Sequence, residues 1–583
     1  VFPQNMGDEG LIKDREREAL AEAGIVLAEG ALPKAFNENF LLYLAMTRAE
    51  QHLTISYAGS NDEGEGLESS LVIKRLQSLG FCTSPIEVPF TIQDGTEDEY
   101  LWRPYQSLSL LSERWGALFS GVPVSPLWWG LYNWARHDGA YRPRLEDVSR
   151  GIRDNNDVPI IAPELVTGLF LKRGYMSGSV TRLEKYRQCP FKFYAQYGLK
   201  LEPRKVRSFG APEIGTFLHA NLERLGTQLL SEHKQWRDLD ETAQQELCAR
   251  VAADILEENR YDEDEKTAYD KAIEERVVRT LQKTVSRLVD WSSRSSFDTM
   301  YLEQDFGRPN GWDSIKVSLG DDRYLRLVGQ IDRIDEYNRD GHTYGMVIDY
   351  KSGSTSVNAQ EIYYGLKLQL MTYLLALESA YKKHHDQPMT PAAVVYTYVK
   401  NPRTPAGEPV SYEEAKALAD TNGALNNKGY FTDDIDMLEK MDKNLLTYKS
   451  KGPYVPVRIT GKGTIHSGDM KIVKSSGDFD IMCRYTESIM ADTGSAIGKG
   501  EFPIAPYQLN KAIPCSYCDY KTVCRFDNER NQYNYLSALN EANALEKMRD
   551  ALNGSSNSAE SNDSFCESSN TDSSMTGGDD NGR

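Results

Sequence analysis

The sequence predicts an α/β protein in which a strand-rich core is flanked by helices. Apolar residues alternate with period two through much of residues 301–352, and they recur at helical spacing in residues 360–382. Hydrophobic residues make up 40% and charged residues 26% of the 583 residues, a composition ordinary for a soluble protein of several domains. No apolar stretch reaches the roughly 18 residues needed to cross a bilayer. We therefore expect a cytoplasmic protein.

The charge and the C-terminal composition limit the function classes. The formal net charge of −19 disfavours a protein that coats DNA by bulk electrostatics, but it leaves room for a narrow basic channel. Residues 553–583 are rich in Ser, Asn, Asp and Gly and offer almost nothing to bury, so we predict a disordered tail. An acidic nuclease that concentrates metal ions is compatible with this composition.

The N-terminal segment, residues 1–60, predicts the end of an α/β domain. Two apolar runs, residues 41–45 and 53–57, predict strands on either side of a polar turn that contains Arg48. The chain opens with Val1 in what resembles mid-domain sequence, and we therefore expect a piece of a longer protein.

Three further regions follow. Residues 61–176 are aromatic-rich and predict a helical connecting region without chemistry of its own. Residues 177–535 predict the main α/β domain, and residues 536–583 predict a C-terminal helix followed by the acidic, Ser-rich tail. Within the main domain the expected elements are helices at 183–198, 215–230, 242–291 and 360–382, strands within 301–352 and at 392–399, and long connecting segments thereafter.

Two predicted strands of the main domain carry a candidate catalytic motif. Residues 324–335 and 346–351 alternate as strands do, and the Asn-Arg-Asp-Gly sequence between them favours a turn, which predicts a hairpin. Period two places Asp349 and Lys351 on one face, and pairing of the two strands brings Asp332 close to Asp349. Two adjacent carboxylates repel each other unless a divalent cation lies between them.

This motif suits metal-dependent phosphodiester hydrolysis. Mg²⁺ or Mn²⁺ polarises a phosphate and lowers the pKa of a bound water, and Lys351 can orient that water or stabilise the developing negative charge. An isolated Asp-Tyr-Lys sequence is more often a strand end that meets solvent. His219, which shares a helix face with Glu223, is a candidate third ligand. Gln369 and Tyr373, at i,i+4, either hold the lysine or a DNA phosphate or lie on a helix surface.

The ordered set of these residues resembles the RecB-family nucleases of the PD-(D/E)XK superfamily. The resemblance implies a restriction-endonuclease-like core with helical additions and a metal-dependent nuclease activity on DNA. The motifs that carry it are His219, Asp332 within Gly-Gln-Ile-Asp-Arg-Ile-Asp, Asp349-Tyr-Lys351, and Gln369-Leu-Met-Thr-Tyr373.

The resemblance also implies a role for each residue. Lys351 is expected to be catalytic, and Gln369 and Tyr373 are expected to support the site. Asp335 is a second acid in the first strand, and it ranks below Asp332 because Asp332 matches the motif. The expected ligands of Mg²⁺ (or Mn²⁺) are His219, Asp332, Asp349 and the backbone carbonyl of Tyr350.

Three of the eight cysteines cluster in the sequence and predict a metal site. Cys515, Cys518 and Cys524 form a Cys-x2-Cys-x5-Cys pattern, and Cys189 at the start of the main domain is the best candidate for a fourth ligand. Four thiolates suit either Zn²⁺ or a [4Fe–4S] cluster. The spacing alone slightly favours zinc, the commoner structural site, although zinc sites often pair two short Cys-x-x-Cys motifs and here the fourth ligand is isolated. The remaining cysteines are expected to be buried small apolar side chains or, in the tail, an incidental thiol: Cys82, Cys248, Cys483 and Cys566.

A second resemblance concerns the cysteines and the N-terminal segment together. One cysteine before a RecB-family nuclease core and three after it resembles the iron–sulfur-stapled group, which implies a [4Fe–4S] cluster joining the two ends of the domain. The sequence Leu-Tyr-Leu-Ala-Met-Thr-Arg-Ala-Glu around Arg48 resembles the last signature motif of superfamily-1 helicases, whose arginine reaches the γ-phosphate of ATP. The chain thus resembles the C-terminal half of the AddB family, with residues 1–60 as the remnant of a helicase-like RecA-type domain.

This family resemblance implies a function and partners. The expected function is that of the nuclease subunit of an AddAB-type ATP-dependent helicase–nuclease, which processes DNA double-strand breaks for recombinational repair. It would cut the 5′-ended strand beside an AddA-type helicase–nuclease subunit. The sequence contains no Gly-x4-Gly-Lys-Ser/Thr phosphate loop, so we do not expect these residues to hydrolyse ATP. Two alternatives are a free-standing Cas4-like iron–sulfur exonuclease, disfavoured by the motif around Arg48, and a non-catalytic DNA-binding scaffold.

Overall fold

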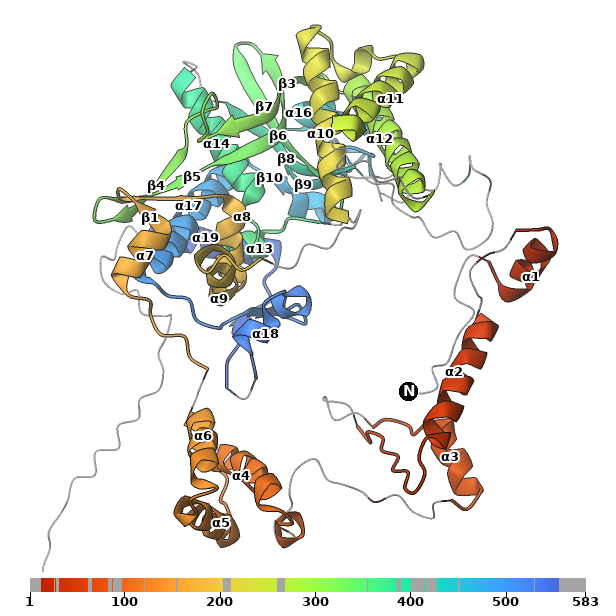
Figure 1. The fold of residues 1–583 in the computed structure, drawn as a ribbon. Coiled ribbons are helices and arrows are strands. Elements are labelled where there is room, and N and C mark those ends of the chain that lie inside the picture. The colour runs from red at the N-terminus through yellow and green to blue at the C-terminus, as the bar shows by residue number, and fades with distance from the viewer. Residues whose placement is uncertain are drawn as a thin grey trace, which may run out of the picture. The chain divides into compact units, whose positions relative to one another are not determined.

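The computed structural model of the chain forms two compact units, Val1–Arg153 and Asp154–Arg583 (Figure 1). None of the helices among the described residues has the length and apolar character needed to span a membrane. The described residues are 12–25, 27, 31–60, 66–81, 86, 97–119, 121–153, 156–202, 211–258, 268–353, 355–384, 389–399, 411, 414, 427–448, 451–528 and 530–554.

The first unit is helical. Its best-packed part is the group α4–α6, where Leu108, Trp128 and Leu145 are buried against one another. Helix α5 begins at Pro126, a position where the N–H that proline lacks would have no partner within the helix. The elements are α1 (Asp14–Glu22), α2 (Ala31–Thr47), α3 (Leu71–Ser78), the 3-10 helix η1 (Glu97–Tyr100), α4 (Pro104–Phe119), α5 (Pro126–His137) and α6 (Arg142–Arg153).

The strands predicted for residues 41–45 and 53–57 are wrong. Residues 41–45 lie inside helix α2, and residues 53–57 adopt no regular secondary structure. A helix satisfies its backbone hydrogen bonds within one segment, whereas a strand requires a neighbouring strand, and the described part of this unit contains none. Arg48 directly follows α2 and is exposed.

The second unit is built on a six-stranded sheet with the order β10-β9-β8-β7-β6-β3. Successive side chains of β7 enter two separate cores, since Met346 and Ile348 belong to one cluster of buried residues and Val347 to the other. The strands are therefore covered on both faces, as their apolar character requires. They are β3 (Asp298–Phe306), β6 (Gly329–Arg339), β7 (His342–Lys351), β8 (Thr390–Tyr398), β9 (Lys428–Thr432) and β10 (Val473–Lys474).

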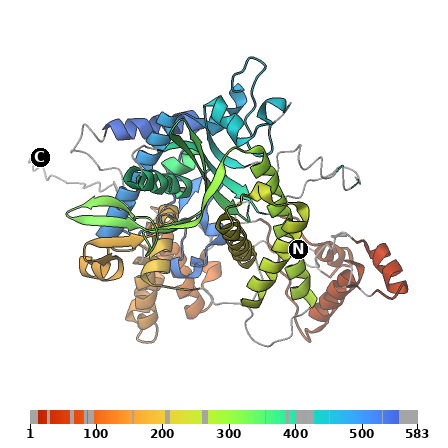
Figure 2. The same cartoon turned by 90° about the horizontal axis from the view of Figure 1, so that it is seen from above.

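Helices cover both faces of this sheet (Figures 1 and 2). Helices α10 and α12 bury residues such as Leu222 and Leu281 in the cluster that contains Ile348. Helices α14 and α17 bury Leu374 and Phe479 in the cluster that contains Val347. The helices of this unit are α7 (Pro163–Phe170), α8 (Val180–Gln188), α9 (Pro190–Phe193), the π-helix η2 (Tyr194–Gly198), α10 (Ala211–Ser231), η3 (Trp236–Asp238), α11 (Glu241–Glu258), α12 (Ala268–Arg294), α13 (Ala359–Tyr363), α14 (Gln369–His384), α16 (Ile435–Met441), η4 (Leu445–Thr447), η5 (Ser467–Ile472), α17 (Ser476–Lys499), η6 (Pro514–Tyr517), α18 (Lys521–Cys524) and α19 (Glu541–Gly554).

Two smaller sheets complete the unit. One has four strands in the order β1-β2-β5-β4, and the other pairs β11 with β12 in parallel. The predicted C-terminal helix is confirmed by α19. The predicted tail, from residue 555 onward, lies outside the described residues. The strands are β1 (Leu171–Lys172), β2 (Tyr175–Gly178), β4 (Ile315–Gly320), β5 (Arg323–Leu327), β11 (Tyr507–Leu509) and β12 (Asn534–Leu536).

Several predicted helices are shorter than expected. The helix predicted for residues 183–198 is interrupted at Cys189, whose backbone is extended because Pro190 follows it. The helix predicted for residues 242–291 is two helices, α11 and α12, and the one predicted for residues 360–382 is also two, α13 and α14.

Helix α17 was not predicted, although it spans 24 residues. The sequence carries two signals for it. Ser475 and Asp478 form a capping box at its start. Gly500, with a φ of 79°, provides the left-handed residue at its end.

Candidate active site

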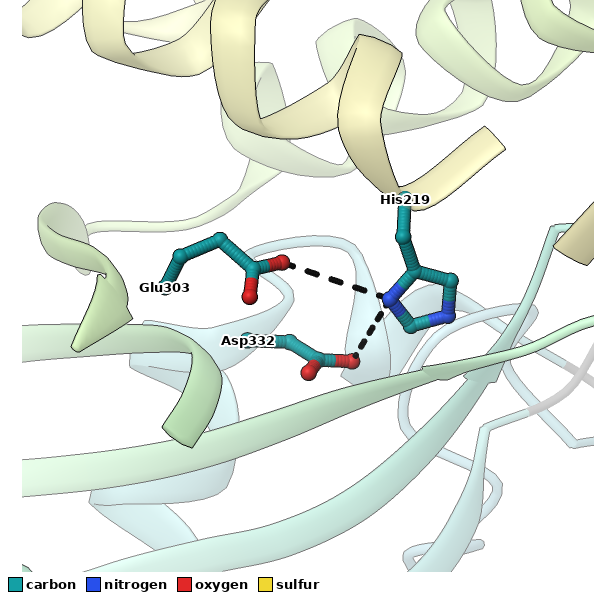
Figure 3. A group of neighbouring side chains, drawn as sticks. All are labelled: His219, Glu303 and Asp332. Atoms are coloured by element: carbon teal, nitrogen blue, oxygen red, sulfur yellow. Dashed lines mark ion pairs between the residues drawn. The ribbon is translucent and has the colours of Figure 1, made fainter. Parts of the chain in front are cut away.

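Three side chains from three elements meet beside the edge strand of the six-stranded sheet (Figure 3). His219 comes from α10, Glu303 from β3 and Asp332 from β6. The Nδ1 atom of His219 lies 3.4 Å from an oxygen of Asp332 and 4.0 Å from an oxygen of Glu303. One potential ligand atom of each residue lies within 4.8 Å of the other two. An imidazole and two carboxylates at these distances are a donor set that a divalent cation can bind.

The register of β6 and β7 brings the two predicted aspartates together. Arg333 pairs with Ile348 in the antiparallel hairpin, so the next pair in the same register is Asp332 and Asp349. The predicted hairpin is thereby confirmed. The backbone N–H of Tyr350 donates a 2.7 Å hydrogen bond to Asp332. Asp332 is therefore tied to the backbone that follows Asp349.

A hydrogen-bonded network surrounds Asp349, whose side chain is buried. Lys351 Nζ lies 2.5 Å from Asp349 Oδ2 and donates to Gln369 Oε1 at 3.1 Å. Gln369 Nε2 donates at 2.8 Å both to Asp349 Oδ1 and to the Tyr373 hydroxyl. Residues predicted from two strands and a separate helix thus form one connected group.

Burial raises the pKa of all three acids, and the charge of Asp332 adds to this rise for Glu303 and Asp349. Burial, together with the charge of Asp332, raises the pKa of Glu303 to about 8. Burial also raises the pKa values of Asp332 and Asp349, and the charge of Asp332 adds to the effect on Asp349. Burial lowers the pKa of His219, which favours the neutral, metal-binding form of its imidazole. The site concentrates negative charge that a cation would stabilise.

The neighbouring acid of β6, Asp335, belongs to the opposite face of the sheet. Both of its oxygens accept hydrogen bonds from the Arg333 guanidinium, at 2.7 and 2.6 Å, and both side chains are almost completely buried. Asp335 lies three residues from Asp332, and an odd spacing along a strand places two side chains on opposite faces. The higher rank given to Asp332 therefore agrees with the geometry.

Two acids near this centre were missed in the sequence. Glu303 adjoins Asp332 because Gln304 pairs with Ile331 in the same register of β3 and β6. No motif marks it, and only the pairing of β3 with β6 could have identified it. Glu184 on α8 is the second, and its carboxylate reaches the start of α14. Glu223, which shares a helix face with His219, is exposed and acts on the centre only through its charge.

The four cysteines predicted as ligands lie near one another. Cys189 ends α8, Cys515 lies in η6, Cys518 follows η6 and Cys524 ends α18. Burial raises the pKa of Cys189 to about 12, and the neighbouring thiols of Cys515 and Cys518 contribute to this rise. Burial also raises the pKa of Cys524, and the neighbouring thiol of Cys518 contributes to this rise. All four are free cysteines.

The expectation for the other cysteines is confirmed where the structure describes them. Cys248 and Cys483 are buried in the two large cores of the second unit. Cys82 and Cys566 lie outside the described residues.

The region that contains the acidic centre and the cysteines, residues 177–525, matches the family model of the PD-(D/E)XK nuclease superfamily. This match covers more than half of the chain. The chain belongs to the PD-(D/E)XK nuclease superfamily. Membership confirms the predicted fold class and implies a divalent metal ion, which the set His219, Glu303 and Asp332 fits.

Curated relatives of this PD-(D/E)XK protein are named as the B subunit of an ATP-dependent helicase/deoxyribonuclease. That of Clostridioides difficile (strain 630) is 31% identical over 570 residues, covering 95% of this chain and 48% of the relative. That of Desulforudis audaxviator (strain MP104C) is 32% identical over 548 residues, covering 92% and 46%. A model of the AddB fifth domain matches residues 94–151. The predicted resemblance to AddB is confirmed, and the chain spans about half the length of the relatives it matches.

Proposed function

We propose that this chain acts as the nuclease part of an AddAB-type ATP-dependent helicase–nuclease. In this role it processes DNA double-strand breaks for recombinational repair and hydrolyses the 5′-ended strand. The observation that carries the proposal is the meeting of His219 and Asp332, 3.4 Å apart, beside the linked pair Asp349 and Lys351. A scaffold that only grips DNA has no need of an acidic centre that repels phosphate in the absence of a cation.

In this proposal each residue of the centre has a defined task. His219, Asp332, Asp349 and the carbonyl oxygen of Tyr350 would hold Mg²⁺ or Mn²⁺, and Glu303 would add a further carboxylate. When bound, the ion polarises a phosphate oxygen and lowers the pKa of a water molecule. The hydrogen bond from the Tyr350 N–H orients Asp332. The buried position of Asp349 excludes water from its side chain and preserves its orientation.

The remaining residues of the centre stabilise the negative charge that develops on the phosphate, either directly or by positioning another side chain. Lys351 stabilises the negative charge on the phosphate, because its ammonium is a preorganised positive group beside the acidic centre. Gln369 restrains both Lys351 and Asp349 by its hydrogen bonds. Tyr373 in turn accepts a hydrogen bond from the Gln369 amide and limits its rotation.

We also propose that Cys189, Cys515, Cys518 and Cys524 bind a [4Fe–4S] cluster. The mutual electrostatic effects of the thiols support a shared metal site, and the resemblance to the iron–sulfur-stapled group favours a cluster over zinc. Such a cluster would tie α8 to the segment after α17 across more than three hundred residues of sequence. Ligation would then contribute directly to the folding free energy of the domain.

The proposed partners are DNA and an AddA-type helicase–nuclease subunit, and the proposed location is the cytoplasm. The proposed partners rest on the relatives, which are named as B subunits of a helicase/deoxyribonuclease. The motif around Arg48 belongs in this proposal to the helicase-like region, where the arginine would approach a nucleotide bound by other parts of the complex.

The decisive experiment is digestion of a strand-labelled duplex by the complex carrying Lys351→Ala. We expect Mg²⁺-dependent degradation of the 5′-ended strand to disappear while degradation of the other strand continues. Lys367→Ala is the matched control, because Lys367 lies near the start of α14 but bonds Glu361 and the Ser356 carbonyl rather than Asp349. Unchanged products with Lys351→Ala would sink the enzymatic proposal in favour of a DNA-binding scaffold.

The cluster assignment has its own test. We expect an anaerobic preparation to be brown, to absorb near about 400 nm and to contain iron rather than zinc. A colourless, zinc-loaded protein with full activity would refute the iron–sulfur assignment and leave the nuclease proposal intact.

A further inference from the structure

Helix α14 carries Gln369 and Tyr373 but lacks a capping side chain of its own. Its first residue is Gln369, and the residue before it is Leu368, which has no side-chain acceptor. The first N–H groups of a helix have no partner within the helix and require an acceptor from elsewhere. Asn, Asp, Ser or Thr at this position usually supplies it.

The missing acceptor comes from α8, far away in the sequence. Glu184 accepts hydrogen bonds from the N–H groups of Leu368, at 2.7 Å, and Gln369, at 3.1 Å. A carboxylate at this place also interacts favourably with the helix dipole. Burial raises the pKa of Glu184 to about 7, whereas these two N–H groups and Lys351 oppose that rise by stabilising its charged form.

A second side chain of α8 restrains the same connection. Arg187 Nε donates to the carbonyl oxygen of Tyr364, which ends α13, at 3.1 Å. Gly365 follows with a φ of 74°, and a Cβ atom there would lie 2.9 Å from the Arg187 side chain. Helix α8 therefore holds both ends of the segment that joins α13 to α14.

We infer that Glu184 is a positioning residue for the nuclease centre, acting through the backbone of Gln369 on the Lys351–Asp349 pair. The geometry provides a continuous path. Glu184 fixes the Gln369 main chain, and the Gln369 side chain binds both Lys351 and Asp349. Displacement of a catalytic group by about 1 Å can reduce a rate by about a hundredfold. The inference rests on the proposed function, because it assigns Glu184 to that same centre.

The test is a double-mutant cycle measured on the full chain in its complex, with Mg²⁺ and a single-stranded oligonucleotide. We expect Glu184→Ala to lower kcat by about tenfold to a hundredfold, with the Kd for DNA within about twofold. In a Gln369→Ala background the same substitution should change kcat by less than about twofold, because the path is already broken. Multiplicative effects of the two substitutions, or an unchanged kcat for Glu184→Ala, would overturn the inference.

Two further variants separate positioning from general stability. Glu184→Gln keeps an acceptor oxygen, so kcat should remain within about threefold of the parent; a loss as large as that of Glu184→Ala contradicts the role of the hydrogen bonds. Asp434→Ala is the matched control, because Asp434 caps α16 through the N–H groups of Asp436 and Met437, and α16 carries no residue of the centre. It should lower the Tm but not kcat. A parent complex with no nuclease activity would instead refute the proposed function itself.

Discussion

The acidic centre and the cysteine group are built in opposite ways. Asp332 and Asp349 lie on adjacent strands of a sheet that is covered on both faces, and the strand register places them opposite each other. The cysteines are carried by helix ends and very short elements, such as the four-residue α18. Regular structure therefore preorganises the acids of this centre, whereas the geometry of the cysteine group would depend on the metal that its thiols bind.

The two regions nevertheless share one element. Helix α8 ends at Cys189, and its side chain Glu184 reaches the start of α14. Loosening the cysteine end of this helix should therefore affect the catalytic end more than their separation in sequence indicates.

The largest effect should separate two acids of the same strand. Asp332→Ala should reduce Mg²⁺-dependent hydrolysis by about a thousandfold or more, because a proposed metal ligand is lost. Asp335→Ala should instead lower the free energy of unfolding by about 3–5 kcal/mol, because it leaves the buried Arg333 guanidinium without its carboxylate. Single-turnover kinetics and chemical denaturation distinguish them. A stable but inactive Asp335→Ala protein would contradict this assignment, because it would give Asp335 the role in hydrolysis that is proposed for Asp332.

Removal of one proposed cysteine ligand should give a smaller effect, on stability and metal content. Cys518→Ser should lower the free energy of unfolding by about 2–5 kcal/mol and release bound metal, because a long-range crosslink is lost. Denaturant titration and metal analysis provide the measurement. Cys248→Ala is the control, since Cys248 is buried away from the group and should leave the metal content unchanged. Equal metal loss in both variants would argue against the proposed ligand set.

The smallest effect should appear as a pH dependence of stability in the presence of EDTA. The pKa of Glu303 is raised to about 8, and those of Asp332 and Asp349 are also raised, so the folded state favours their protonated forms. Unfolding frees these acids to ionise, so their contribution to stability falls as the pH rises from about 4 towards about 8. We expect the protein to be about 1–3 kcal/mol less stable at pH 8 than at pH 6, judged by denaturant midpoints.

Added Mg²⁺ should restore the stability lost at pH 8, because a bound cation favours the ionised acids. Asp332→Asn removes one of the interacting charges and should reduce the pH dependence. A protein that becomes more stable in EDTA as the pH rises would contradict the crowding of charge at this centre.

The hairpin of the centre could be predicted from short, regular patterns, whereas the roles of His219, Gln369 and Tyr373 were expected from the resemblance to RecB-family nucleases. The alternation in β6 and β7 specified which side chains share a face, and the turn between them specified the pairing. Glu303 could not be predicted, since the pairing of β3 with β6 leaves no trace in the spacing of the sequence. Glu184 could not be predicted either, because it lies 184 residues before Leu368, whose N–H group it binds.

The strand prediction for the N-terminal segment was wrong for a different reason. The apolar run at residues 41–45 suits a strand or a helix equally, and period alone does not decide between them for so short a stretch. The structure places it in α2, where the backbone satisfies its own hydrogen bonds.

Local patterns were sufficient to predict the hairpin of the acidic centre and the grouping of three cysteines, since each depends on neighbours a few positions apart. The tertiary structure, by contrast, brings Glu303 to His219 and Asp332, pairs Asp335 with Arg333, and places Glu184 at the start of α14. These contacts arise from strand order and helix packing, which bring distant segments together to bury apolar surface, and no local pattern encodes such a meeting.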